Sequence, residues 1–277
     1  MTLTAHKGKN ELSLQSEKVV VDGNEILFYV VGKDGFLLYH DGSRALLPSI
    51  MKMSSSVMKT VRGSSGICKE LQAIISFLEN SSSFELLSLN EMRQSSRGNV
   101  ETIGASGKNL PSFIKGMSEK QRCSFMEKLK KLLGGKIQEV NAETKGKPGW
   151  NQINTIEKYR NNFVKVTSKE MSDGMLRLLA FIAISEMQSP EAVMLLDEVE
   201  NGINTDYAES LMRIMQDMYK EKKHQLILTT HSTVFLDYVK ADDIIFLYRD
   251  EDGYTKAVHL FEDNFFKDNH GTKTEKQ

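Results

Sequence analysis

In the segment 193–198, VMLLDE, four consecutive apolar residues are followed by two carboxylic acids. A short, continuous apolar run predicts a strand buried on both faces, as in a parallel sheet covered by helices. The two acids then fall at the carboxyl end of that strand, the edge where α/β sheets bind ligands. Because successive strand residues point to opposite sides, we expect Asp197 and Glu198 to have different environments and to take different roles.

Outward from this strand, helices and apolar strands alternate in regular succession over 161–262. A strongly apolar helix is predicted over 176–187, and further buried strands are predicted over 226–228 and 244–247. This succession predicts an α/β sandwich whose sheet is covered by helices on both faces. The helix that follows the strand at 193–196 carries one apolar stripe, formed by Tyr207, Leu211, Ile214, Met215 and Met218.

The region 1–66 has a different pattern. Short β-branched runs alternate with turn residues such as DGN at 22–24, which predicts an antiparallel β meander. We expect a helical and loop-rich lobe over 67–160, beginning with a helix over 67–78. A polar tail over 263–277 completes the predicted organisation.

Within the middle lobe, one helix has a clear start signal. Ser118, with Gln121 three residues later, fits a capping box. The polar segment 79–111 is predicted to form loops with at most one short strand. The segment 142–150 is interpreted as a connection that leads into a strand over 163–166.

Composition excludes several classes of protein. The formal charge is −1, from 36 basic and 37 acidic residues, so no global basic field attracts nucleic acid or an anionic membrane. Two cysteines, Cys68 and Cys123, form neither a disulfide framework nor a CxxC pair. No signal peptide or membrane span is expected, and we predict a reduced, cytoplasmic protein without a membrane partner.

The segment 171–177, MSDGMLR, places a serine and a glycine at the start of the apolar helix. A helix N-terminus offers unpaired N–H groups, and a glycine lets backbone approach a phosphate closely. An ordinary helix cap at Ser172 explains the same pattern when the segment is taken alone. Arg177 could neutralise a phosphate or lie on an exposed face, and the exposed position is favoured.

Two strand ends carry the other chemical groups. Asp197 could hold a magnesium ion, and Glu198 could position or deprotonate an attacking water. Ordinary solvated acids are an equal alternative for the pair alone, and Glu200 is interpreted as structural. The second segment, LILTTHS at 226–232, ends a buried strand with His231, which could donate a hydrogen bond to a phosphate or simply cap or pack the loop.

In this order and spacing, SDG at 172–174, DEVENG at 197–202 and TTHS at 229–232 resemble the motifs of ABC-type ATPases. The resemblance is closest to the RecF/SMC-like and OLD-like AAA ATPases of prokaryotes, and it is strong over 165–259. It implies a P-loop NTPase-like head that binds ATP and Mg²⁺. The motif that follows the acids departs from the family pattern at Val199.

The resemblance also implies roles for single residues. Ser172, Asp173 and Gly174 would form the signature that contacts a nucleotide bound by the opposite protomer in a head-to-tail homodimer. Asp197 would be the metal-binding acid, Glu198 the catalytic glutamate and His231 the switch. The remaining implied positions, those of the loop that crosses the dimer interface, are Asn201 and Asn204.

A phosphate-binding loop with the pattern GxxxxGK[ST] does not occur in the 277 residues. We therefore expect this chain to be the C-terminal portion of a longer ATPase, or a split subunit that meets a P-loop-bearing partner chain. The resemblance implies DNA repair or anti-phage defence, with an effector nuclease or DNA as partner. Two alternatives remain: a regulatory module that lends its signature to a partner ATPase, and a metal-dependent nuclease using Asp197, Glu198 and Glu200.

Overall fold

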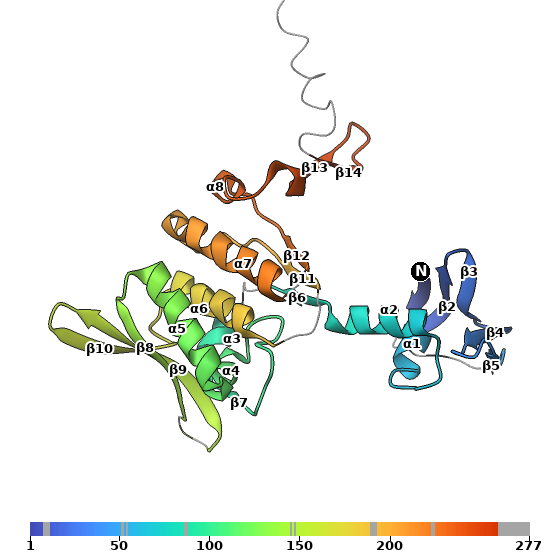
Figure 1. Ribbon diagram of the computed structural model, residues 1–277, viewed down its shortest axis with the longest axis horizontal. Coiled ribbons are helices and arrows are strands. Elements are labelled where there is room, and N and C mark those ends of the chain that lie inside the picture. Colours follow the sequence, from blue (N-terminus) through green and yellow to red (C-terminus); the bar gives the residue numbers. More distant parts are fainter. Residues whose placement is uncertain are drawn as a thin grey trace, which may run out of the picture. The chain divides into compact units, whose positions relative to one another are not determined.

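The computed structural model describes residues 1–7, 12–50, 53, 55–85, 88–144, 146, 148–188, 193–222 and 225–259 (Figure 1). The chain divides into two compact units, Met1–Ser82 with Glu191–Val193, and Ser83–Pro190 with Met194–Gln277. The predicted polar tail over 263–277 lies outside the described residues. Each unit has a hydrophobic core of its own.

The first unit contains a five-stranded antiparallel sheet whose strands follow one another in chain order. This confirms the predicted meander. At the first tight turn, Asp22 and Gly23 both have positive φ, 48° and 80°, which matches the twist of the flanking strands. The strands are β1 (Thr2–Lys7), β2 (Leu12–Val21), β3 (Asn24–Val30), β4 (Lys33–Leu38) and β5 (Arg44–Leu47).

Two helices complete this unit, α1 (Val57–Thr60) and α2 (Lys69–Asn80), the latter two residues later than predicted. Apolar side chains of both helices and of the sheet form one core. Glu17 is fully buried beneath α1, where its carboxylate accepts hydrogen bonds from the Ser56 hydroxyl and the Val57 N–H, each at 2.6 Å. The buried charge therefore has the donors it requires.

The second unit contains a four-stranded antiparallel sheet in which β9 is central. Its strands are β7 (Ser96–Arg97), β8 (Ile137–Thr144), β9 (Trp150–Tyr159) and β10 (Asn162–Thr167). The prediction of a connection over 142–150 was wrong, because most of β8 and all of β9 were missed. The strand β9 lacks the apolar pattern of a buried strand, because polar residues fill several of its buried positions. These include Asn151, Gln152, Asn154 and Thr155.

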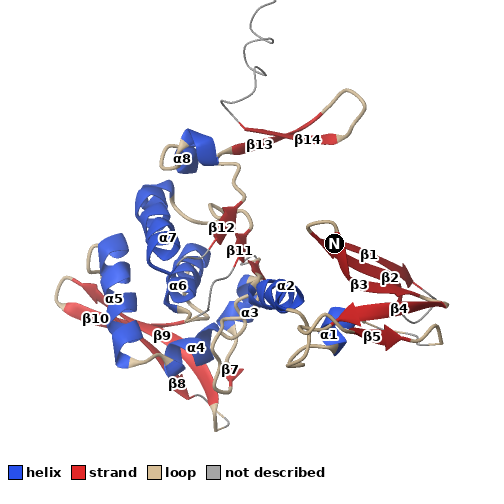
Figure 2. Cartoon of the chain, turned by 45° about the vertical axis from the view of Figure 1, so that its right-hand side comes forward, coloured by secondary structure: helices blue, strands red, loops and turns tan. Residues whose placement is uncertain are grey.

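Helices pack against this sheet and against one another (Figure 2). The predicted capping box is confirmed, since Ser118 and Gln121 cap the helix reciprocally. Almost every residue of the predicted apolar helix is buried, so this helix runs through the core. The helices are α3 (Leu89–Arg93), α4 (Leu110–Gly116), α5 (Glu119–Leu133) and α6 (Asp173–Glu186).

A three-stranded sheet with the order β12-β11-β6 carries the acidic pair. It consists of β6 (Ser82–Phe84), β11 (Val193–Leu196) and β12 (Gln225–Leu228). The helix α7 (Ala208–Lys222) packs against α6 and β12. Leu195 and Ile227 are 39% and 49% exposed. The prediction that helices cover both faces of this sheet was therefore wrong.

The C-terminal elements correct one further prediction. After α8 (Thr233–Leu236), the strand β13 (Ile245–Arg249) pairs with β14 (Thr255–His259) in a two-stranded antiparallel hairpin. Ile245 and Leu247 are 58% and 61% exposed, so the strand predicted over 244–247 is not buried. An apolar run predicts a strand but does not show whether that strand lies in a buried sheet or pairs only with the next strand, as β13 does with β14. No helix within the described ranges is both long and apolar enough to cross a membrane.

Candidate functional site

Hydrogen bonds bring the carboxyl ends of three strands together. The Thr229 N–H, just after β12, donates to Leu196 O at the end of β11 over 2.9 Å. The Asp197 N–H donates to Phe84 O at the end of β6 over 3.4 Å. The acids after β11 and the hydroxyls and histidine after β12 therefore share one sheet edge, as the sequence predicted.

Thr229 links the two acids at this edge. The Thr229 hydroxyl donates to Asp197 Oδ1, and Thr229 Oγ1 in turn accepts from the Glu198 N–H at 2.8 Å. Asp197 is exposed at the sheet end. Carboxylate and hydroxyl oxygens are the ligands that Mg²⁺ prefers, and this ion usually takes only one or two protein ligands beside phosphate and water. Asp197 and Thr229 fit that role.

Glu198 has an unusual backbone conformation. Its φ is 46°, in the left-handed region that residues other than glycine rarely adopt. Such a conformation costs about 1–3 kcal/mol and persists where surrounding contacts hold it. Here the Asn201 side-chain amide donates to Glu198 Oε2 at 2.9 Å, and the Asn201 N–H donates to Glu198 O at 3.0 Å. The Glu198 carboxylate is thus held by a neighbour in the following turn, whereas the Asp197 carboxylate is held by Thr229.

Glu200 holds the loop that contains His231. One Glu200 carboxylate oxygen accepts from the His231 N–H at 2.6 Å. Burial raises the pKa of Glu200, but hydrogen bonds from the His231 N–H and the Thr230 hydroxyl outweigh burial and leave this pKa below its usual value. The His231 side chain is exposed at the sheet edge. Glu200 therefore acts on the position of the histidine loop, in agreement with the structural interpretation of this residue.

The start of α6 packs directly against the turn that follows the acids. A Cβ placed on Gly174 would lie 2.6 Å from Gly202 O, closer than any Cβ contact can be. The Ser172 hydroxyl accepts from the Met175 N–H at 3.3 Å and so caps the helix. Asn204 similarly accepts from the Asp206 N–H at 3.1 Å and caps the short 3₁₀ helix 205–207.

Asp173, at the first position of α6, forms an ion pair with Arg93 at the end of α3, with Nη2 and Oδ1 2.5 Å apart. Arg93 also donates to Met171 O at 3.0 Å. An acid in the first turn of a helix interacts favourably with the helix dipole. Arg93 and Asp173 thereby fix the backbone on which Ser172 and Gly174 are presented.

Three contributors to the site could not be recognised from the sequence. Thr229 lies in the segment 226–232, but only its hydrogen bonds to both acids give it a role. Arg93 lies 80 positions before its partner Asp173, so no local pattern connects them. Arg177 was expected on an exposed face but is 6% exposed.

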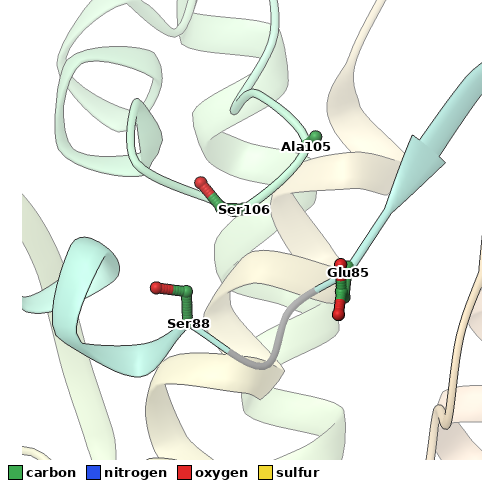
Figure 3. A pocket seen from close by; sticks show the side chains of 4 residues that line it. All are labelled: Glu85, Ser88, Ala105 and Ser106. Atoms are coloured by element: carbon green, nitrogen blue, oxygen red, sulfur yellow. The ribbon is translucent and has the colours of Figure 1, made fainter.

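A pocket of about 350 Å³ opens beside the end of β6. Glu85, Ser88 and Ser106 place polar groups around it, as Figure 3 shows. The Glu85 N–H donates to Ala105 O at 2.9 Å, which joins the strand end to the loop before α4. The pocket therefore borders the same strand end to which Asp197 is hydrogen-bonded.

The fold is mixed α/β, with two acids at the carboxyl edge of one sheet. The chain belongs to a family of AAA domains: the family model described as "AAA domain, putative AbiEii toxin, Type IV TA system" matches residues 99–237, about half of the chain. No match was found among curated proteins.

Several solved structures of SMC head domains are similar to the chain. An SMC head bound to the C-terminal winged-helix domain of ScpA is 15% identical, with a TM-score of 0.48, and the match covers 89% of this chain and 71% of that one. The SMC head domain of Thermotoga maritima is 14% identical, with a TM-score of 0.38 and coverage of 90% and 73%. An Smc head domain derived from Pyrococcus furiosus is 20% identical, with a TM-score of 0.39, and the match covers 50% of this chain and 34% of that one. These similarities support no transfer of individual residues.

Proposed function

We propose that this chain supplies the hydrolytic half of an ATPase site. The observation that carries the proposal is the meeting of Asp197, Glu198 and the His231 loop at one sheet edge, linked by Thr229. Family membership in the AAA domains supports ATP as the substrate. The two acids have distinct surroundings, as a division between ion binding and water activation requires.

In this proposal each group has one task. Asp197, with its exposed carboxylate beside the Thr229 hydroxyl, holds Mg²⁺, and this ion neutralises charge on the phosphates when bound. Glu198, oriented by Asn201, positions the attacking water and accepts its proton. The exposed imidazole of His231 donates to the transferring phosphate.

The phosphate-holding half of the site is proposed to come from outside these 277 residues. A P-loop would arrive on a longer version of the polypeptide or on a partner chain, and the start of α6 would face a nucleotide across a head-to-tail dimer. Ser172 and Gly174 would then contact the γ-phosphate through the helix N-terminus. Asn201 and Asn204 would lie in the loop that crosses the same interface.

We place this ATPase in prokaryotic DNA repair or anti-phage defence, where ATP-driven dimerisation would license an effector nuclease or a contact with DNA. The setting rests on the resemblance of the motifs. A regulatory module that supplies its Ser172–Gly174 helix start to a partner ATPase is the second candidate. ATPase stimulation of a P-loop partner that persists in Glu198→Gln would favour the module.

The nuclease alternative has less support. Three metal-binding acids would have to face one point, yet Glu198 is held by Asn201 and Glu200 by the His231 loop. Among the residues with described positions, no three His, Cys, Asp or Glu side chains gather in a way that could hold a metal ion.

The proposal is tested by titrating Mg·ATP into the purified 277-residue chain by calorimetry, and then into the chain mixed with its P-loop-bearing portion. We expect no measurable heat in the first titration and binding in the second. Tight Mg·ATP binding by the isolated chain would refute the division of the site.

A further inference from the structure

A buried arginine lies beneath the site and has no assigned role. Arg177, in the second turn of α6, is 6% exposed, and its Nε has no hydrogen-bond partner among the described residues. An unpaired N–H of a charged group in a protein interior costs free energy, so a purely structural position would favour an apolar side chain.

The same helix contains a buried charge that has an ion-pair partner and a hydrogen-bond donor. Glu186, near the C-terminus of α6, is also 6% exposed, but its carboxylate accepts from Lys128 Nζ at 2.6 Å and from the Ser124 hydroxyl at 2.7 Å. By contrast, Arg177 Nε is a buried donor without a partner in the described part of the chain, and this lowers the stability of the folded protein.

The surroundings of Arg177 are the parts of the proposed ATPase site. A Cβ placed on Gly202 would lie 3.3 Å from Arg177 Nε, so the guanidinium packs under the turn after the acids. Burial lowers the pKa of Arg177, while the charges of Asp173 and Glu198 act in the opposite direction. Asp173 is four residues earlier on α6, and Glu198 belongs to the strand end.

We propose that Arg177 is the positioning residue of this site: from beneath Gly202 it fixes Glu198 and the following turn relative to the start of α6. The guanidinium supplies the positive charge between Asp173 and Glu198, and its planar shape spans from the helix to the turn. This inference rests on the proposed hydrolysis of ATP at Glu198.

The test compares Arg177→Met, Arg177→Lys and the control Lys128→Met in the complete ATPase, measuring kcat, KM for ATP and the thermal midpoint. We expect Arg177→Met to lower kcat about 10- to 100-fold, as misplacement of a reacting group does, with KM unchanged within about twofold. Its thermal midpoint should equal or exceed that of the wild type, because a buried N–H without a partner and its desolvation cost are removed. Arg177→Lys should recover part of kcat.

Lys128→Met should behave in the opposite way, with a lower midpoint and an unchanged kcat. It removes the cation that pairs with the buried Glu186 carboxylate, at the end of α6 opposite to the proposed site. If Arg177→Met lowered the midpoint and left kcat intact, Arg177 would be structural and the inference would be overturned. Should the wild type hydrolyse ATP no faster than Glu198→Gln, the proposed function itself would fail, and the two failures are thereby distinguishable.

Discussion

Gly174→Ala tests the close fit between α6 and the turn after the acids. In a helix, alanine is favoured over glycine by about 1 kcal/mol. At this position, however, the new Cβ would lie 2.6 Å from Gly202 O, a backbone atom that cannot rotate away. Overpacking costs about 1–3 kcal/mol, and we expect the upper part of that range, about 2–3 kcal/mol, because the clashing oxygen belongs to the backbone rather than to a flexible side chain. We therefore expect a net destabilisation of about 1–2 kcal/mol.

Gly116→Ala is the matched control, because Gly116 is also helical and its added Cβ would meet only the side-chain oxygen of Asn99, at 3.4 Å. Thermal unfolding followed by circular dichroism should show a midpoint lowered by about 2–8 °C in Gly174→Ala, since 1 kcal/mol shifts a unit of this size by about 2–4 °C. In Gly116→Ala the midpoint should be unchanged or higher. A Gly174→Ala protein at least as stable as the wild type would refute the packing argument.

Two further substitutions test separate parts of the structure. Ser118→Ala removes one half of the capping box of α5 and should cost about 1 kcal/mol in urea unfolding at pH 7; no change would show that the cap contributes nothing. The pKa of Glu200 is lowered from the ordinary value of 4.5, so its ionised form stabilises the folded protein above about pH 4.5, and this stability is lost as pH falls through the lower folded value. The stability difference between wild type and Glu200→Gln should therefore be full at pH 6 and vanish in strong acid, and a difference independent of pH would contradict this.

Local patterns predicted the elements that have strong, short-range signals. The meander, the capping box at Ser118 and the strand at Val193–Leu196 follow from turn residues, a cap and an apolar run. The central strand β9 escaped prediction because polar side chains fill its buried positions. The exposed strand β13 shows the reverse error, since its apolar run is paired only within a hairpin of the described chain.

The candidate site was predictable in its residue types but not in its connections. Asp197 and Glu198 could be placed at a strand end from the sequence, because the carboxyl edge follows from the strand direction. The bridging role of Thr229, the left-handed backbone of Glu198 and the burial of Arg177 depend on contacts between segments far apart in the chain. Such contacts have no local sequence signature.

The catalytic role of Glu198 is tested by ATP turnover of the complete protein carrying Glu198→Gln, measured beside the wild type and with ATP binding determined in parallel. Glutamine keeps the size of the side chain and the contact with Asn201 but cannot accept the proton of the attacking water. If Glu198 activates the attacking water, turnover falls by about 100-fold or more while ATP binding is retained. Turnover equal to that of the wild type would contradict this role.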